Sequence, residues 1–237
     1  MKVFFLGLEQ RVKSSNLLKY KIVVSNLVKK FGNKVILRNI SFNVRDAEIF
    51  VINGPSGSGK STLLRCLNRL IEPDGGEIYL DGVNVFDLDP LELRRRIGLV
   101  SQIPAMFDGT VQDNLLYGPM FHNIRLTRDD LINILELVGL DENFLDRKAI
   151  DLSVGEQQRV AIARALTLKP KVLLMDEPTS HLDPENTRII EKLILSLRDK
   201  LKMTFIIVSH DVEQSKRLAD RIAFLENGEI KSVKENR

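Results

Sequence analysis

The sequence predicts an α/β fold, built as a mainly parallel sheet with an N-terminal antiparallel β region and an inserted α-helical subdomain. Three observations lead to this prediction. Short apolar runs alternate with helical stretches, an Asp-Gly turn follows strand-like segments near the N-terminus, and residues from about 112 to 168 have helical periodicity alone. A chain of 237 residues is long enough to bury a full core as one large or two small domains.

The N-terminal segments predict the antiparallel region. Residues 21–24, 35–37 and 40–44 have strand character, and Asp81-Gly82 is typical of a tight hairpin. Residues 1–20 carry scattered charge without a clear period. We therefore expect residues 1–20 to be an appendage and residues 21–237 to form the main domain.

Four later apolar runs predict parallel strands buried on both faces: 49–52, 97–100, 172–175 and 205–208. Helical stretches separate them, including a helix expected over 62–70. Residues 131–138 and 157–164 read as helices without a strand between them. This change of pattern places the helical insertion at about 105–168.

The composition argues against a nucleic-acid-binding, a disulfide-linked and a membrane-spanning protein. With 43% apolar residues, 28% charged residues and a net charge of +3, the chain has no strong field that would suggest nucleic acid as a partner. The single cysteine, Cys66, cannot form an internal disulfide and favours a reduced, cytosolic setting, where we expect it to be a small core residue. We identify no export signal and no run of about 18 apolar residues that would span a bilayer.

A glycine-rich loop follows the first buried strand and opens a helix, which is the context that a phosphate-binding GxxxxGK[ST] motif requires. Its glycines let successive backbone N–H groups face a phosphate, and the helix N-terminus adds positive partial charge. Lys60 would neutralise the β- and γ-phosphates, and Ser61 would bind Mg²⁺. The nucleotide-binding loop is Gly54, Pro55, Ser56, Gly57, Ser58, Gly59, Lys60, Ser61 and Thr62.

Two adjacent carboxylates end the apolar run 172–175. Asp176 and Glu177 lie where the carboxyl end of a parallel strand is expected, the edge at which open α/β sheets bind ligands. Strand alternation points the two side chains in different directions. We expect Asp176 to hold Mg²⁺, directly or through water, and Glu177 to act as the general base.

Residues 151–166, Asp-Leu-Ser-Val-Gly-Glu-Gln-Gln-Arg-Val-Ala-Ile-Ala-Arg-Ala-Leu, resemble the signature and following helix of the ABC ATPases. Leu152, Ser153 and Gly155 agree with the family consensus Leu-Ser-Gly-Gly-Gln, whereas Val154 and Glu156 depart from it. The resemblance extends over roughly residues 21–230. It implies a P-loop NTPase core and an ATP-hydrolysing subunit of an ABC transporter that uses ATP and Mg²⁺.

The departure at Glu156 has a physical interpretation. Ser153 and Glu156 have the spacing of a capping box before an apolar-periodic helix, so Glu156 is expected to point away from the phosphate. The alternative is an inward carboxylate that repels the γ-phosphate. The family implies that Ser153 and the Gly155 amide contact ATP held by a second subunit.

The resemblance implies further site residues. Phe31, placed just after the first strand, would stack on adenine, with a plain core or turn aromatic as the alternative. Gln102 would reach Mg²⁺ and link the core to the helical insertion. His210 would contact the γ-phosphate and orient the attacking water beside Glu177. His181 replaces a small residue in the family and is interpreted as tolerated packing.

The family also implies partners. Two copies would close head to tail around two ATP molecules, forming a homodimer whose opening reaches transmembrane permease subunits through the Gln102 region. Residues 103–107 would help to form the groove for a partner's cytoplasmic helix, or would pack in the core. The expected location is the cytoplasm, peripheral on the inner face of the cell membrane.

The cargo depends on weaker features. Residues 107–119 are similar to the corresponding stretch of phosphate importers and of some metal- or nucleotide-sugar-linked transporters, and residues 146–151 lack a stretch typical of fused exporters. The sequence thus favours import of phosphate, a metal or another small ion through separate membrane subunits. The alternative is a non-transport ABC ATPase acting in a nucleic-acid or ribosome process, although the segment between Gln102 and Leu152 is too short for the long coiled coil of the chromosome proteins.

Overall fold

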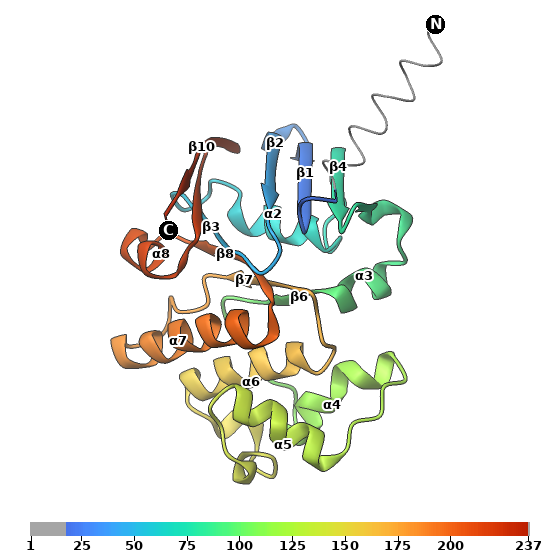
Figure 1. Ribbon diagram of the computed structural model, residues 1–237, viewed down its shortest axis with the longest axis vertical. Helices are drawn as coiled ribbons and strands as arrows, with labels where there is room; N and C mark the ends of the chain where they lie inside the picture. Colours follow the sequence, from blue (N-terminus) through green and yellow to red (C-terminus); the bar gives the residue numbers. More distant parts are fainter. Residues whose placement is uncertain (1–17, 237) are drawn as a thin grey trace, which may run out of the picture.

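The computed structural model describes residues 18–236, and its antiparallel sheet lies at one end of the molecule (Figure 1). The sheet has the order β2-β1-β4-β5 and consists of β1 (Ile22–Phe31), β2 (Lys34–Val44), β4 (Gly75–Leu80) and β5 (Val83–Asn84). Asp81 and Gly82 join β4 to β5 with φ values of 50° and 78°, as a primed hairpin turn requires. The predicted antiparallel region is confirmed, whereas most of the predicted appendage, residues 1–17, lies outside the described residues.

The second sheet has the order β10-β9-β3-β8-β7-β6. Neighbouring strands from β9 to β6 are parallel, and β10 pairs with β9 in the antiparallel sense. The strands are β3 (Ile49–Asn53), β6 (Ile97–Val100), β7 (Val172–Asp176), β8 (Thr204–Ser209), β9 (Arg221–Glu226) and β10 (Glu229–Glu235). The mainly parallel sheet is confirmed, and β9 and β10 are strands that the sequence analysis did not identify.

Alternating residues of the central strands belong to two hydrophobic cores. Ile49 and Val51 pack with the helices on one face, whereas Phe50 and Ile52 pack with the antiparallel sheet and α2 on the other. All four side chains are at most 1% exposed. Burial on both faces explains why these strands read as continuous apolar runs.

Helices α4, α5 and α6 follow one another between β6 and β7 and gather at the end of the molecule opposite the antiparallel sheet (Figure 1). Two short 3₁₀ turns, Glu142–Phe144 and Ala149–Asp151, precede α6. Among residues 18–236, no helix combines the length and apolar character needed to cross a membrane. The helices are α2 (Lys60–Leu67), α3 (Pro90–Arg96), α4 (Val111–Phe121), α5 (Arg128–Leu137), α6 (Val154–Leu166), α7 (Pro184–Leu201) and α8 (Val212–Leu218).

Candidate functional site

The carboxyl ends of β3, β7 and β8 meet at one edge of the parallel sheet. β8 lies between the other two strands, with Asn53 beside Ser209 and Asp176 beside Val208. The phosphate loop follows β3, Glu177 follows β7 and His210 follows β8. Parallel pairing therefore brings three segments that are distant in sequence to one edge, where α/β sheets bind ligands.

The phosphate loop has the backbone conformation that its glycines permit. Gly57 and Gly59 have φ values of 76° and 106°, and a side chain at Gly54 would collide with the carbonyl oxygen of Leu225 on β9. Helix α2 begins at Lys60, two residues before the predicted start at Thr62. The loop therefore ends directly at a helix N-terminus, which favours an anion.

Lys60 is 5% exposed, and its Nζ donates to the carbonyl oxygens of Gly54 and Pro55 over 2.9 and 3.0 Å. The ammonium group is thus held inside the curl of the loop. The Ser58 hydroxyl is buried in the same loop and has no hydrogen-bond partner within residues 18–236. A buried polar atom without a partner among the described residues and an ammonium hydrogen-bonded to two loop carbonyls fit a loop that binds a phosphate.

Ser61 and Asp176 are brought together as predicted, with Ser61 Oγ donating to Asp176 Oδ1 over 2.8 Å. Asp176 is only 5% exposed, and burial raises its pKa, although the hydrogen bond from Ser61 opposes that shift. A hydroxyl and a carboxylate are oxygen ligands of the kind that Mg²⁺ prefers. The two residues fit a magnesium site beside the phosphate loop.

Glu177 and His210 face each other across the same edge. His210 Nδ1 lies 2.9 Å from Glu177 Oε2, and the other carboxylate oxygen, Oε1, lies 3.8 Å from Lys60 Nζ. The backbone of Glu177 has a φ of 45°, a conformation that is uncommon for residues other than glycine. Glu177 therefore lies just beyond β7, where strand alternation does not apply, and its carboxylate contacts Lys60 and His210 while that of Asp176 accepts from Ser61.

Gln102 follows β6 by two residues and contacts a different part of the site from the one expected. Its Nε2 donates to Ser180 Oγ over 3.2 Å, and the Ser180 hydroxyl donates to the carbonyl oxygen of Glu177 over 3.1 Å. His181 Nδ1 lies 2.9 Å from the same hydroxyl. Within residues 18–236, no hydrogen bond joins Gln102 to Ser61 or Asp176, so its role at Mg²⁺ stays a prediction.

The predicted capping box at the start of α6 is confirmed. Glu156 Oε2 accepts from Ser153 N over 2.8 Å and from Ser153 Oγ over 2.7 Å, while Glu156 N donates back to Ser153 Oγ over 3.4 Å. The hydrogen bond from the Ser153 side chain is the main cause that lowers the pKa of Glu156. Gly155 is buried, and a side chain there would collide with Asn186 on α7.

Phe31 is the last residue of β1 and not, as predicted, the residue after it. The ring is 51% exposed, and Lys29 Nζ lies 5.2 Å from its centroid. Half-exposure excludes a core aromatic, whereas the alternative of a turn aromatic stays, because Phe31 directly precedes the turn at Gly32 and Asn33. An exposed ring can stack on a planar ligand, so adenine contact stays a prediction.

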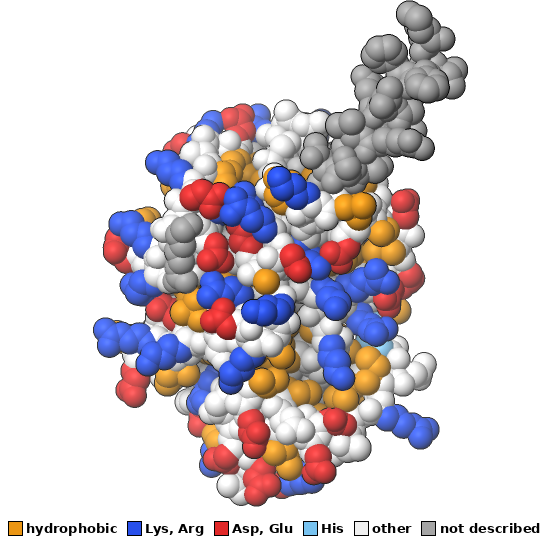
Figure 2. All heavy atoms as spheres, viewed as in Figure 1, with side chains coloured by type: hydrophobic (Ala, Val, Ile, Leu, Met, Phe, Trp, Pro, Cys, Tyr) orange, Lys and Arg blue, Asp and Glu red, His pale blue; other side chains and the backbone are white. Residues whose placement is uncertain are grey.

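An exposed aromatic cluster lies beside the Gln102 segment, and Phe107 is the one residue of it that the sequence analysis placed in a possible partner groove. Phe107 stacks on Tyr117 with ring centroids 4.1 Å apart, and Tyr117 packs edge-on against Phe121 at 5.3 Å. The exposed fractions rise from 38% for Phe107 to 65% for Phe121 and 73% for Met120. Figure 2 shows hydrophobic side chains gathered over α4, below the basic side chains of α3.

This aromatic cluster borders a cavity of about 270 Å³ that is also lined by Arg94, Arg95 and Arg164. Ile103 is 69% exposed, so the alternative of core packing for residues 103–107 is wrong for Ile103 and Phe107. Tyr117 and Phe121 are four residues apart on one helix, and this spacing is the signal that could have identified the surface. Contiguous exposed apolar groups of this kind mark interaction sites.

Comparisons with known proteins agree with this geometry. The sequence profile of the ABC transporter family matches residues 37–180. Protein STAR1 of Oryza sativa subsp. japonica is 48% identical over 198 residues, a match that covers 84% of this chain but only 57% of the rice protein. The phosphate import ATP-binding protein PstB of Saccharolobus solfataricus is 44% identical over 220 residues, covering 87% of this chain and 85% of that protein.

A solved structure has the same fold. The dimeric post-hydrolysis state of the ATP-binding cassette MJ0796, bound to ADP and Pi, superposes with a TM-score of 0.80 at 33% identity. The match covers 91% of this chain and 99% of that one.

Proposed function

The chain belongs to the ABC transporter family and is one of its ATP-hydrolysing cassettes, and on that premise we propose that it drives solute import through separate membrane subunits. The observation that carries the ATP-hydrolysing part of the proposal is the meeting of Lys60, Ser61, Asp176, Glu177 and His210 at one sheet edge. A phosphate-binding loop, a magnesium-binding pair and a paired carboxylate together have the parts for phosphoryl transfer to water.

In the proposed mechanism, Lys60 and the backbone N–H groups at the start of α2 bind the triphosphate of ATP. Ser61 and Asp176 hold Mg²⁺, which when bound neutralises the charge that develops on the phosphate oxygens. The buried Ser58 hydroxyl would gain a hydrogen-bond acceptor when a phosphate occupies the loop. Phe31 offers its exposed ring to adenine.

Glu177 takes the proton of the attacking water as general base. His210, 2.9 Å from Glu177 Oε2, holds that carboxylate in place and turns the water toward the phosphate. Gln102 is connected to the site through Ser180, whose hydroxyl donates to the backbone carbonyl of Glu177.

A second copy of the chain would complete the site. Ser153 is exposed at the N-terminus of α6, and no hydrogen bond among the described residues joins Ser153 or Gly155 to the chain's own phosphate loop, so the ATP that this helix end would contact is one held by a partner. Because Glu156 Oε2 accepts from Ser153 N and Ser153 Oγ in the capping box, the carboxylate is directed to the N-cap residue and not to that phosphate. The dimeric state of MJ0796 supports this arrangement.

The aromatic cluster supports a membrane partner. Phe107, Tyr117, Met120 and Phe121 form an apolar surface next to the segment that carries Gln102, so a permease helix seated there would be coupled to the site. We place the cassette on the cytoplasmic face of the membrane against such subunits. The similarity to PstB makes phosphate the first solute to test.

The test is uptake of radiolabelled phosphate by cells that lack the gene and are complemented with the wild-type chain or with Glu177→Gln. We expect uptake to be lost on deletion, restored by the wild type and not by the variant. Unchanged phosphate uptake in the deletion strain would exclude phosphate as the cargo. A purified wild-type chain that releases no phosphate from ATP, alone or with its permease, would contradict the proposal as a whole.

A further inference from the structure

Gln214, on α8, lies where the segments that carry Glu177 and His210 meet, and it is 2% exposed. Its Nε2 donates to Thr179 Oγ1 over 2.6 Å, and its Oε1 accepts from Ser209 Oγ over 3.2 Å. Thr179 lies two residues after Glu177, and Ser209 directly precedes His210. One buried amide therefore links the segment after β7 to the end of β8.

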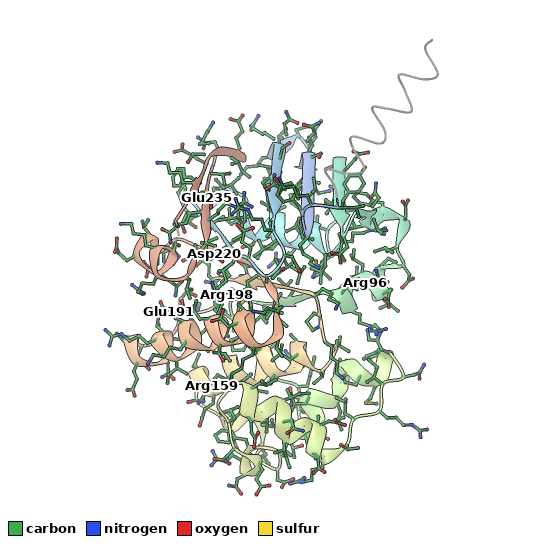
Figure 3. All side chains as sticks on the ribbon, viewed as in Figure 1. Arg96, Arg159, Glu191, Arg198, Asp220 and Glu235 are labelled. Carbon is green, nitrogen blue, oxygen red and sulfur yellow. The ribbon has the colours of Figure 1, made fainter. Side chains whose placement is uncertain are left out.

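A third anchor fixes the orientation of this amide. Gln214 Nε2 also lies 3.4 Å from Oε1 of Glu191, which belongs to α7 (Figure 3). Glu191 is 7% exposed and is itself held by Arg217, with Nε to Oε2 at 3.0 Å and Nη2 to Oε1 at 2.6 Å. The carboxylate accepts from the NH₂ group of Gln214, so the amide oxygen is left to face Ser209.

The backbone of the same residue is fixed as well. Gln214 N donates to Asp211 Oδ1 over 3.0 Å, and Asp211 N donates to Ser209 Oγ over 3.0 Å. The Ser209 hydroxyl therefore accepts from one neighbour and donates to the other. These bonds tie the first turn of α8 to the strand end that carries His210.

We propose that Gln214 is a positioning residue that sets the separation of Glu177 and His210. The inference rests on the proposed function of these two residues. The amide donates to Thr179 and accepts from Ser209 at the same time, whereas a leucine of similar size has neither a donor nor an acceptor. Gln214 does not touch the reacting atoms, and it acts through the two segments that it joins.

The test compares ATP hydrolysis by Gln214→Leu, Thr179→Val and the double variant. We expect each single substitution to lower kcat by about tenfold while KM for ATP changes by less than about twofold, because misplacement affects the chemical step more than nucleotide binding. The double variant should be no slower than the slower single variant, since both remove one link. Thr179→Ser, which keeps the hydroxyl, should retain the wild-type kcat.

Gln112→Leu is the matched control, because Gln112 lies on α4 and makes its side-chain bond to Arg128. It should leave kcat unchanged. An active wild type together with unchanged kcat in both Gln214→Leu and Thr179→Val would overturn the inference. Losses that multiply in the double variant would overturn it too, since they would show independent effects.

Amide hydrogen exchange over residues 177–183 gives a readout that does not require turnover. We expect faster exchange there in Gln214→Leu than in the wild type or in Gln112→Leu, and exchange that stays unchanged would overturn the inference even if the wild type proved inactive. If Gln214→Leu does not fold, Thr179→Val serves for both measurements. An inactive wild type with the expected exchange pattern would instead count against the proposed function alone.

Discussion

Ser61 Oγ donates a hydrogen bond to Asp176 Oδ1 over 2.8 Å, joining residues that are 115 positions apart in the chain. The bond links the first turn of α2 to the end of β7 and thereby places the two oxygen ligands of the proposed magnesium site side by side. Asp176 is buried, so its surroundings determine whether it is charged.

Replacing Ser61 with Ala removes a magnesium ligand and the bond that opposes protonation of Asp176. We expect the Mg²⁺ concentration that gives half-maximal ATP hydrolysis to rise by about tenfold or more, the scale of losing one ordering contact at a metal site. The measurement is a magnesium titration of phosphate release. Ser232→Ala, on the edge strand β10, is the control and should titrate like the wild type.

Substituting Gly54 tests the close approach of the phosphate loop to β9. A Cβ at Gly54 would collide with the backbone oxygen of Leu225, so Gly54→Ala should lower the free energy of unfolding by about 2–3 kcal/mol. Gly57→Ala has open space around it and should cost about 1–2 kcal/mol through its positive φ alone. Urea unfolding of both variants checks the order, and an equal cost would contradict the steric explanation.

The Ser153–Glu156 capping box should make stability depend on pH. The pKa of Glu156 is lowered in the folded protein, so its contribution is complete above the unfolded pKa, near the usual glutamate value, and disappears as the pH falls through the lowered folded pKa. Glu156→Ala should therefore destabilise the protein by about 1 kcal/mol at pH 7. Thermal melts of wild type and variant from pH 7 to pH 3 should converge, and a constant difference would exclude the charge as the cause.

Cys66 should be chemically inert in the native protein. The side chain is fully buried, and burial raises the pKa of the thiol to about 12. Since the thiolate is the reactive form, a disulfide reagent at pH 8 should label the chain only after denaturation. Rapid labelling under native conditions would show that the core around α2 opens.

The fold was predictable where one local pattern determines the structure. The apolar runs of β3 and β7 were predictable as strands because both faces of the sheet are buried there. The capping box was predictable because Ser153 and Glu156 are three residues apart. β10 was missed because it is an edge strand that is mostly exposed, with polar residues along it.

The candidate site was predictable in its motifs and not in its contacts between distant segments. Lys60, Glu177 and His210 belong to recognisable sequences, whereas the bond of Gln102 to Ser180 depends on how the loops pack. Gln214 has no motif, since its side-chain partners Thr179, Ser209 and Glu191 come from three other elements or loops. Residues of this kind can be identified only from the structure, in which their partners lie close together.

The account's central claim is that two copies of the chain complete each ATP site. It is tested most directly by the solution mass of Glu177→Gln, which should bind ATP without hydrolysing it, measured with and without ATP and Mg²⁺. We predict a single chain without nucleotide and twice that mass with ATP. A variant that binds ATP tightly yet keeps the mass of one chain would contradict the claim and remove the basis for placing Ser153 and Gly155 at a partner's phosphate.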